Sequence, residues 1–104
     1  ACMMMRRNVF EEAGGFNEEL AVAYGDVDHC LTLRQKGYLV VYNPGAELYH
    51  RESATRGYED TPEKRERFAK ERQYMLHKWG DVLTSDPYYS PNLTLEREDF
   101  SIRV

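Results

Sequence analysis

The sequence has no long apolar run and few cysteines, and these shortages exclude several classes of protein. No stretch approaches the ~20 apolar residues that a helix needs to span a bilayer, so we expect no transmembrane segment. The two cysteines, Cys2 and Cys30, have neither CxxC spacing nor the density of a disulfide scaffold. We therefore expect reduced thiols in a cytoplasmic protein. The first residues also lack a basic stretch followed by an apolar one, so we predict no secretory signal.

Positive charge is not in excess: 14 Lys and Arg residues stand against 18 Asp and Glu residues, giving a formal net charge of −4. A nucleic-acid-binding domain normally has a basic stripe. Residues 59–72 have the most basic side chains, but their five positive charges are matched by five negative ones, and Glu66 and Lys70 have the spacing of a helical ion pair. We interpret this segment as a solvated helix face and expect no nucleic-acid partner.

The length and composition are those of one globular domain. At 104 residues the chain is one domain or part of one, and 41% hydrophobic with 31% charged residues is typical of a folded protein. Size scaling predicts that roughly 60–70% of the unfolded surface is buried on folding, which is enough for one modest core. No repeat, low-complexity segment or linker divides the sequence, so we predict a single domain over residues 1–104.

Apolar runs and turn residues predict a mixture of strands and helices. Two or three short strands are expected, at residues 2–5, 38–42 and 46–50. Three helices are expected, over residues 6–13, 26–36 and 61–80. Glycine follows or ends each of these helices, which suits the positive φ of a helix C-terminus. The remaining residues, 81–104, are rich in turn formers, and we expect an irregular tail.

Two carboxylates, Asp26 and Asp28, begin the expected central helix. Acidic residues at the first turn of a helix are explained by capping and by the helix dipole. The same position suits a general base, because a carboxylate at a helix start has a fixed direction and, after the loop that ends at Gly25, can face a cleft. The two interpretations are compatible.

The last expected strand, 46–50, ends at His50 and is followed by the polar segment 51–57. A histidine at a strand end can bind a divalent metal through its neutral imidazole, or can be an ordinary surface residue. Arg56 follows two hydroxyl-bearing residues, and its guanidinium matches the oxygens of a diphosphate. We interpret His29 and His77, which fall on helices, as structural.

The order of these motifs resembles the second half of a family 2 glycosyltransferase catalytic domain. The segments that carry the resemblance are GGF, GDVDHCLTLRQKGY, VVYNPGAELYH and RESATRG. A later segment, DPYYSPNLT, looks like the tail of bacterial members that act on polysaccharide or O-antigen sugars. The resemblance covers nearly the whole chain. It implies an α/β fold: a partial GT-A (Rossmann-like) domain with two or three short strands, a central helix, a long C-terminal helix and an irregular tail.

The resemblance also implies a function for each candidate residue. Asp26 matches the base that deprotonates the acceptor hydroxyl, and His50 matches a histidine that in some members helps to hold the metal or the diphosphate. Arg56 lies in the loop that covers the donor diphosphate, and we assign Asp28 with it to substrate or diphosphate binding. The implied cofactor is Mg²⁺ or Mn²⁺. The implied partners are a nucleotide-sugar and a saccharide acceptor.

The sequence departs from the family in two respects. Gly25 stands where the family often has glutamate before the base, and the nucleotide-binding half with its acidic Asp-x-Asp motif is absent. We therefore interpret the chain as the acceptor-side half of a glycosyltransferase domain, inactive by itself and forming a homo-oligomer that covers its apolar faces. Two alternatives are a non-catalytic remnant that serves as an interaction module, and a small metal-binding domain around His50 and Asp26.

Overall fold

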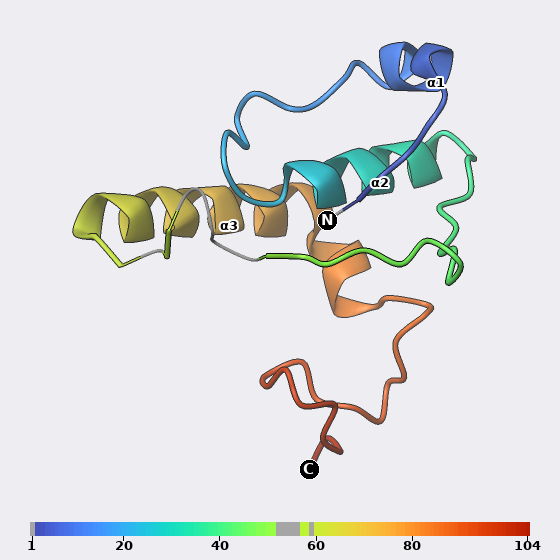
Figure 1. Ribbon diagram of the computed structural model, residues 1–104. Coiled ribbons are helices and arrows are strands. Elements are labelled where there is room, and N and C mark those ends of the chain that lie inside the picture. Colours follow the sequence, from blue (N-terminus) through green and yellow to red (C-terminus); the bar gives the residue numbers. More distant parts are fainter. Residues whose placement is uncertain (1, 52–56, 59) are drawn as a thin grey trace. The chain divides into compact units, whose positions relative to one another are not determined.

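The structure is a computed structural model that describes residues 2–51, 57–58 and 60–104 (Figure 1). Three helices lie within these residues: α1 (Arg7–Glu12), α2 (Gly25–Gln35) and α3 (Pro62–Thr84). The chain forms two compact units, Ala1–Arg72 and Gln73–Val104, and the boundary between them falls within α3. In the part of the chain that the structure describes, no helix has the length and apolar character to cross a bilayer.

The predicted α/β fold is wrong. Across the described residues there is no strand, and the only ladder contact is one antiparallel bridge between Leu93 and Ile102. All three segments expected as strands, 2–5, 38–42 and 46–50, have irregular backbone. The partial GT-A (Rossmann-like) arrangement is therefore not formed by these residues.

The physical reason is that a strand requires a neighbour. Valine and tyrosine favour an extended backbone, but a β-strand exists only when its N–H and C=O groups pair with those of a second strand. None of the three segments pairs with another described segment. The apolar side chains of residues 39–42 consequently remain exposed. The residue types of these segments favour an extended backbone, but they do not provide a neighbouring strand to pair with.

The three predicted helices are confirmed, and each boundary agrees within one residue except the end of α3. The C-terminal signal of α2 acts as expected: Gly37 has a φ of 89°, and the amide of Tyr38 donates to the carbonyl of Leu33 over 3.0 Å. Helix α3 instead runs past Gly80 to Thr84. A glycine inside a helix costs only about 1 kcal/mol, and the Thr84 hydroxyl donates to the carbonyl of Gly80 over 2.9 Å.

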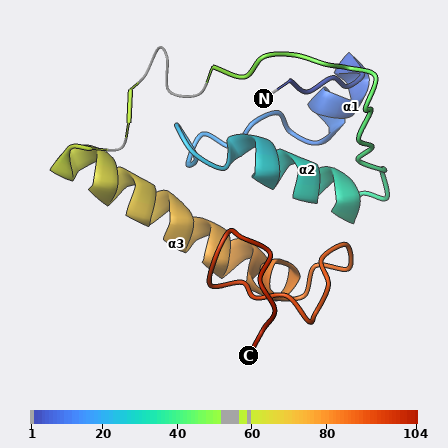
Figure 2. The ribbon, with the colours of Figure 1, turned by 60° about the horizontal axis from the view of Figure 1, so that its bottom comes forward.

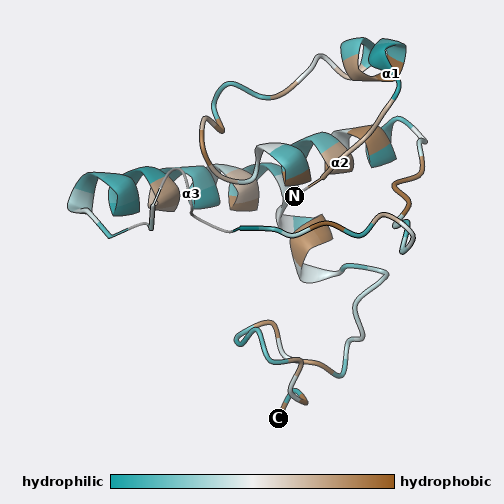
Figure 3. Cartoon of the chain, in the orientation of Figure 1, coloured by the Kyte–Doolittle hydropathy of each residue, from teal (hydrophilic) through white to brown (hydrophobic). Residues whose placement is uncertain are grey.

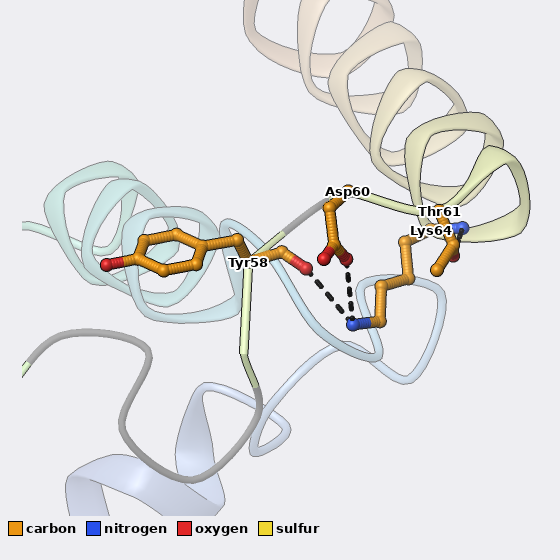
Figure 4. A network of polar contacts seen from close by, with 4 residues as sticks. All are labelled: Tyr58, Asp60, Thr61 and Lys64. Carbon is orange, nitrogen blue, oxygen red and sulfur yellow. Dashed lines mark hydrogen bonds and ion pairs between the residues drawn. The ribbon is translucent and has the colours of Figure 1, made fainter.

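The first turn of α3 has the Thr61 cap that the sequence predicts, and Lys64 adds contacts that the sequence did not predict (Figure 4). The amide of Lys64 donates to the Thr61 hydroxyl over 3.3 Å. The ammonium of Lys64 lies 3.0 Å from the carbonyl oxygen of Tyr58 and 3.5 Å from a carboxylate oxygen of Asp60. One turn further along, the predicted pair of Lys70 and Glu66 is also formed, at 2.8 Å.

The core of the first unit includes three residues of α2, Asp28, His29 and Leu33, and Figure 2 shows where this helix lies. His29 is fully buried there: its Nδ1 lies 3.1 Å from the carbonyl oxygen of Gly15, and its Nε2 lies 3.0 Å from the sulfur of Met5. The rings of Phe10 and Phe16 lie 5.3 and 5.2 Å from the imidazole. The N-terminal segment, α1 and the loop after it are thereby packed against α2, and Leu20 and Leu33 complete the buried set.

The second unit has a small core at the C-terminal half of α3. Met75 and Trp79, one turn apart, are its buried apolar residues, and Figure 3 shows such apolar positions recurring along an otherwise hydrophilic helix. The predicted irregular tail, 81–104, begins only after Thr84, because its first four residues belong to α3. It turns back on itself where the amide of Thr94 donates to the carbonyl of Ser101 over 2.8 Å. The hydroxyl of Tyr89 also donates to the carbonyl of Thr94, over 2.9 Å.

The difference between buried and exposed leucines gives a test of this core. Leu33 is 6% exposed, so Leu33→Ala should lower the free energy of unfolding by about 2 kcal/mol or more. Leu39 is 75% exposed, so Leu39→Ala should change it by less than about 0.5 kcal/mol. Urea unfolding followed by far-UV circular dichroism measures both values. Equal effects of the two substitutions would contradict the described core.

Candidate functional site

The carboxylate of Asp26 lies on the first turn of α2 and is exposed. The expectation that Asp26 caps this helix is wrong, because the N-cap residue is Tyr24 and no side chain caps the helix. The Asp26 carboxylate instead accepts a hydrogen bond from the amide of Val27 over 2.9 Å. A carboxylate that is exposed and fixed in direction can accept a proton from a bound hydroxyl.

The residue that begins the helix has a strained backbone. Tyr24 has a φ of 63°, in the left-handed region that a bulky side chain rarely adopts. Its ring lies 5.4 Å from the ring of Phe68 on α3. Burial raises the pKa of the Tyr24 hydroxyl, while Arg72 lowers it and the Glu71 carboxylate raises it further. The phenol is therefore protonated at neutral pH and can donate a hydrogen bond.

The loop before Tyr24 is held by a buried carboxylate. Glu71, on α3, is 4% exposed. One of its oxygens accepts a hydrogen bond from the amide of Val22 over 3.0 Å, and the other accepts one from the amide of Ala23 over 2.9 Å. These two bonds join residues 49 and 48 positions apart, so they fix the loop to a helix far along the chain.

Sequence reasoning missed Glu71 because it was counted with the solvated charges of residues 59–72. A signal was present in the spacing. Glu71 lies three residues after Phe68 and four before Met75, so it falls on the apolar stripe that continues to Trp79. A charged residue on such a stripe is buried only when hydrogen bonds satisfy it, which predicts a specific partner.

The remaining predicted site residues differ in their surroundings. Asp28 is on the same turn of α2 but is buried, whereas His50 is exposed on an irregular segment. Within the described residues, no hydrogen bond or ion pair joins His50 to Asp26. Arg56 lies outside the described residues. The roles assigned to these four residues therefore stay predictions.

The described residues do not form a metal site. No group of three or more His, Cys, Asp or Glu side chains is close enough together, among the residues that the structure describes, to hold an ion. A divalent cation such as Mg²⁺ needs several oxygen ligands, and His50 is at most one nitrogen ligand. The described side chains by themselves therefore do not supply the ligand set that Mg²⁺ or Mn²⁺ needs.

The chain is similar in sequence to segments of several longer known proteins. No protein-family model and no solved structure matches it. It is 54% identical over 101 residues to the uncharacterised protein y4gI of Sinorhizobium fredii, covering 96% of this chain and 11% of that protein. It is 38% identical over 105 residues to the O-antigen biosynthesis protein RfbC of Myxococcus xanthus, covering 99% of this chain and 8% of that protein.

A shorter match adds a named activity. Over 57 residues, 55% of this chain, the sequence is 37% identical to an N-acetylglucosaminyl-diphospho-decaprenol L-rhamnosyltransferase of Mycobacterium tuberculosis, of which the match covers 19%. The homologues of this chain include glycosyltransferases. The chain spans between 8% and 19% of the length of these three relatives.

Cys30 lies one turn after Asp26 on α2, and the pKa of its thiol depends on the charge of the Asp26 carboxylate. Burial raises the pKa of Cys30, and the Asp26 carboxylate raises it further. A raised pKa lowers the thiolate fraction at a given pH, and the thiolate is the reactive form. We expect Asp26→Asn to speed the alkylation of Cys30 by iodoacetamide about twofold or more near pH 8, because a pKa falls when a nearby negative charge is removed.

Mass spectrometry of the Cys30 peptide measures this alkylation rate. The matched control is Glu19→Gln. It removes the charge of an exposed acidic side chain outside α2 and should leave the rate unchanged. A Cys30 rate that is the same with and without Asp26→Asn would show that the Asp26 carboxylate does not face the thiol.

Proposed function

We propose that this chain supplies the acceptor-side segment of a glycosyltransferase that transfers a sugar from a nucleotide-sugar to a saccharide acceptor, in polysaccharide or O-antigen biosynthesis. The alignment of 99% of the chain with RfbC and the shorter match to a rhamnosyltransferase support the class of reaction. The observation that carries the proposal within the chain is the exposed Asp26 carboxylate, on a helix turn whose preceding loop is tied to α3 by Glu71.

The chemistry proposed for Asp26 is general-base catalysis. Its carboxylate takes the proton of an acceptor hydroxyl while that oxygen forms a bond to the anomeric carbon of the donor sugar. The bond between the anomeric carbon and the diphosphate oxygen breaks, and its electron pair leaves with the nucleoside diphosphate. One displacement of this kind inverts the anomeric configuration. The products are the extended saccharide, the nucleoside diphosphate and a protonated Asp26.

The other assigned residues complete the proposal without a metal step. Arg56 is proposed to bind the diphosphate, since a guanidinium neutralises the charge that develops on the leaving group. His50 is proposed as one ligand of the Mg²⁺ or Mn²⁺ of a complete enzyme. The other ligands are not among the described residues of this chain. We therefore propose that the chain alone does not transfer sugar at a useful rate.

A segment exchange tests the role of Asp26. In RfbC, the segment that aligns with this chain is replaced by residues 1–104, and transfer of labelled sugar is measured in extracts of Myxococcus xanthus that lack native RfbC. We expect Asp26→Asn to lower the transfer rate by about two orders of magnitude or more, because the amide cannot accept the proton. Glu66→Gln, a change of an exposed acid on α3, should leave transfer within about twofold.

Two results would count against the proposal. The first is an exchanged enzyme that transfers sugar equally well with and without Asp26→Asn. The second is a complete loss of transfer when the unmodified segment replaces its counterpart in RfbC.

Exposed apolar side chains favour a second candidate function, self-association. Leu39, Val41 and Tyr42 are exposed on one segment, and Leu48 and Tyr49 follow on the next. Runs of exposed large apolar residues mark surfaces that other molecules cover. We propose a second copy of the chain as the partner, which makes this segment an interaction module whether or not the chain belongs to an active enzyme.

Self-association is tested with the purified chain. We expect light scattering to give a mass above 12.2 kDa that rises with concentration. Val41→Lys together with Leu48→Lys should shift the mass toward that of one chain, because charged side chains are not buried without partners. As a control, Val104→Lys changes an exposed residue of the tail and should not alter the mass. A single chain mass at all concentrations would contradict this second function.

A further inference from the structure

The buried carboxylate of Glu71 makes a specific polar contact with the loop before α2. Both of its oxygens are used, and both donors are consecutive backbone amides, those of Val22 and Ala23, at 3.0 and 2.9 Å. These amides precede Asp26 by four and three residues. The contact thus lies next to the proposed base but does not include it.

A buried carboxylate needs a reason. Removing a charge from water costs several kcal/mol unless hydrogen bonds replace the lost water, and bonds to a charged acceptor are roughly twice as strong as neutral ones. An apolar residue of similar size would often stabilise a core as well as a buried charge does. Backbone amides of a loop, however, can be held only by an acceptor. What Glu71 provides is therefore the position of the loop, rather than stability in general.

The loop that Glu71 holds is tightly folded. A side-chain carbon added at Gly25 would lie 3.4 Å from the carbonyl oxygen of Leu20, so the chain passes close to itself there. Between these residues, Tyr24 is kept in the left-handed region at φ 63°. A backbone of this kind costs about 1–3 kcal/mol and persists only when its surroundings hold it. The bonds to Glu71 are made by the residues immediately before Tyr24.

We infer that Glu71 is a positioning residue for sugar transfer: it holds the Val22–Ala23 backbone so that α2 begins at Gly25 and presents Asp26 in a fixed direction. This inference rests on the proposed function, because it assigns Glu71 to the same site. The ring of Tyr24 against Phe68 gives the loop a second attachment to α3, one turn before Glu71. Glu71 acts through Asp26 and does not touch the reacting atoms.

Amide hydrogen exchange in the chain itself tests the contact. Glu71→Gln keeps the size of the side chain but places an N–H₂ group against one backbone amide, and Glu71→Asp shortens the reach. We expect both variants to exchange the amides of Val22 and Ala23 about tenfold faster or more. Glu66→Gln, on the preceding turn of the same helix, is the matched control and should leave both rates unchanged.

The alkylation rate of Cys30 gives a measure of where the Asp26 carboxylate lies. If Glu71 fixes the start of α2, Glu71→Gln should remove most of the effect of Asp26→Asn on the alkylation rate of Cys30. A double-mutant cycle in the purified chain measures this coupling without any enzyme activity. In the exchanged RfbC, Glu71→Gln should lower kcat about tenfold while the KM for the donor stays within about twofold, since only the position of the base is lost.

Each outcome decides between the roles. Faster exchange confined to the loop before α2 and to its first turn, with loss of the Asp26 effect on Cys30 and a lower kcat, supports the positioning role. Faster exchange throughout α2 and α3 would show that Glu71 only stabilises the fold, and an unchanged kcat after loss of loop protection would also overturn the inference. If Asp26→Asn leaves transfer unchanged, the proposed function fails instead, whatever the exchange rates show.

Discussion

The two hydrogen bonds from the Val22 and Ala23 amides to the Glu71 carboxylate are the constraint on which the arrangement of the first unit depends. The described residues form no sheet, so backbone ladders cannot join distant parts of the chain. A side chain must do so instead. Glu71 connects α3 to the loop that begins α2, and the direction of the first turn of α2 follows from that connection.

The interior of this unit is polar for its size. Asp28, His29 and Glu71 are buried, together with two apolar residues, Leu20 and Leu33. Buried polar groups add little net stability but are strongly unfavourable when their partners are lost. His29 shows the same principle as Glu71, since its ring nitrogens contact the Gly15 carbonyl and the Met5 sulfur. Such contacts select one arrangement of the irregular segments.

The strands that the sequence predicted show where local reasoning ends. The run from Tyr38 to Tyr42 has the composition of a buried strand, yet most of its side chains are exposed and its backbone forms no β-ladder with a described segment. A strand needs a partner at a distance along the chain, and nothing within the run supplies one. The relatives are much longer than this chain, which covers 8% to 19% of them.

The sequence by itself determined the three helices, the stop at Gly37 and the ion pair of Glu66 with Lys70, because each depends on residues within about one turn of the helix. It also indicated Asp26 as a candidate base at the start of α2. Only the tertiary structure decided that Tyr24 rather than Asp26 is the N-cap residue, that Glu71 holds the loop, and that the expected strands do not form. These features depend on contacts between residues far apart in the sequence, which periodicity and local propensity do not specify.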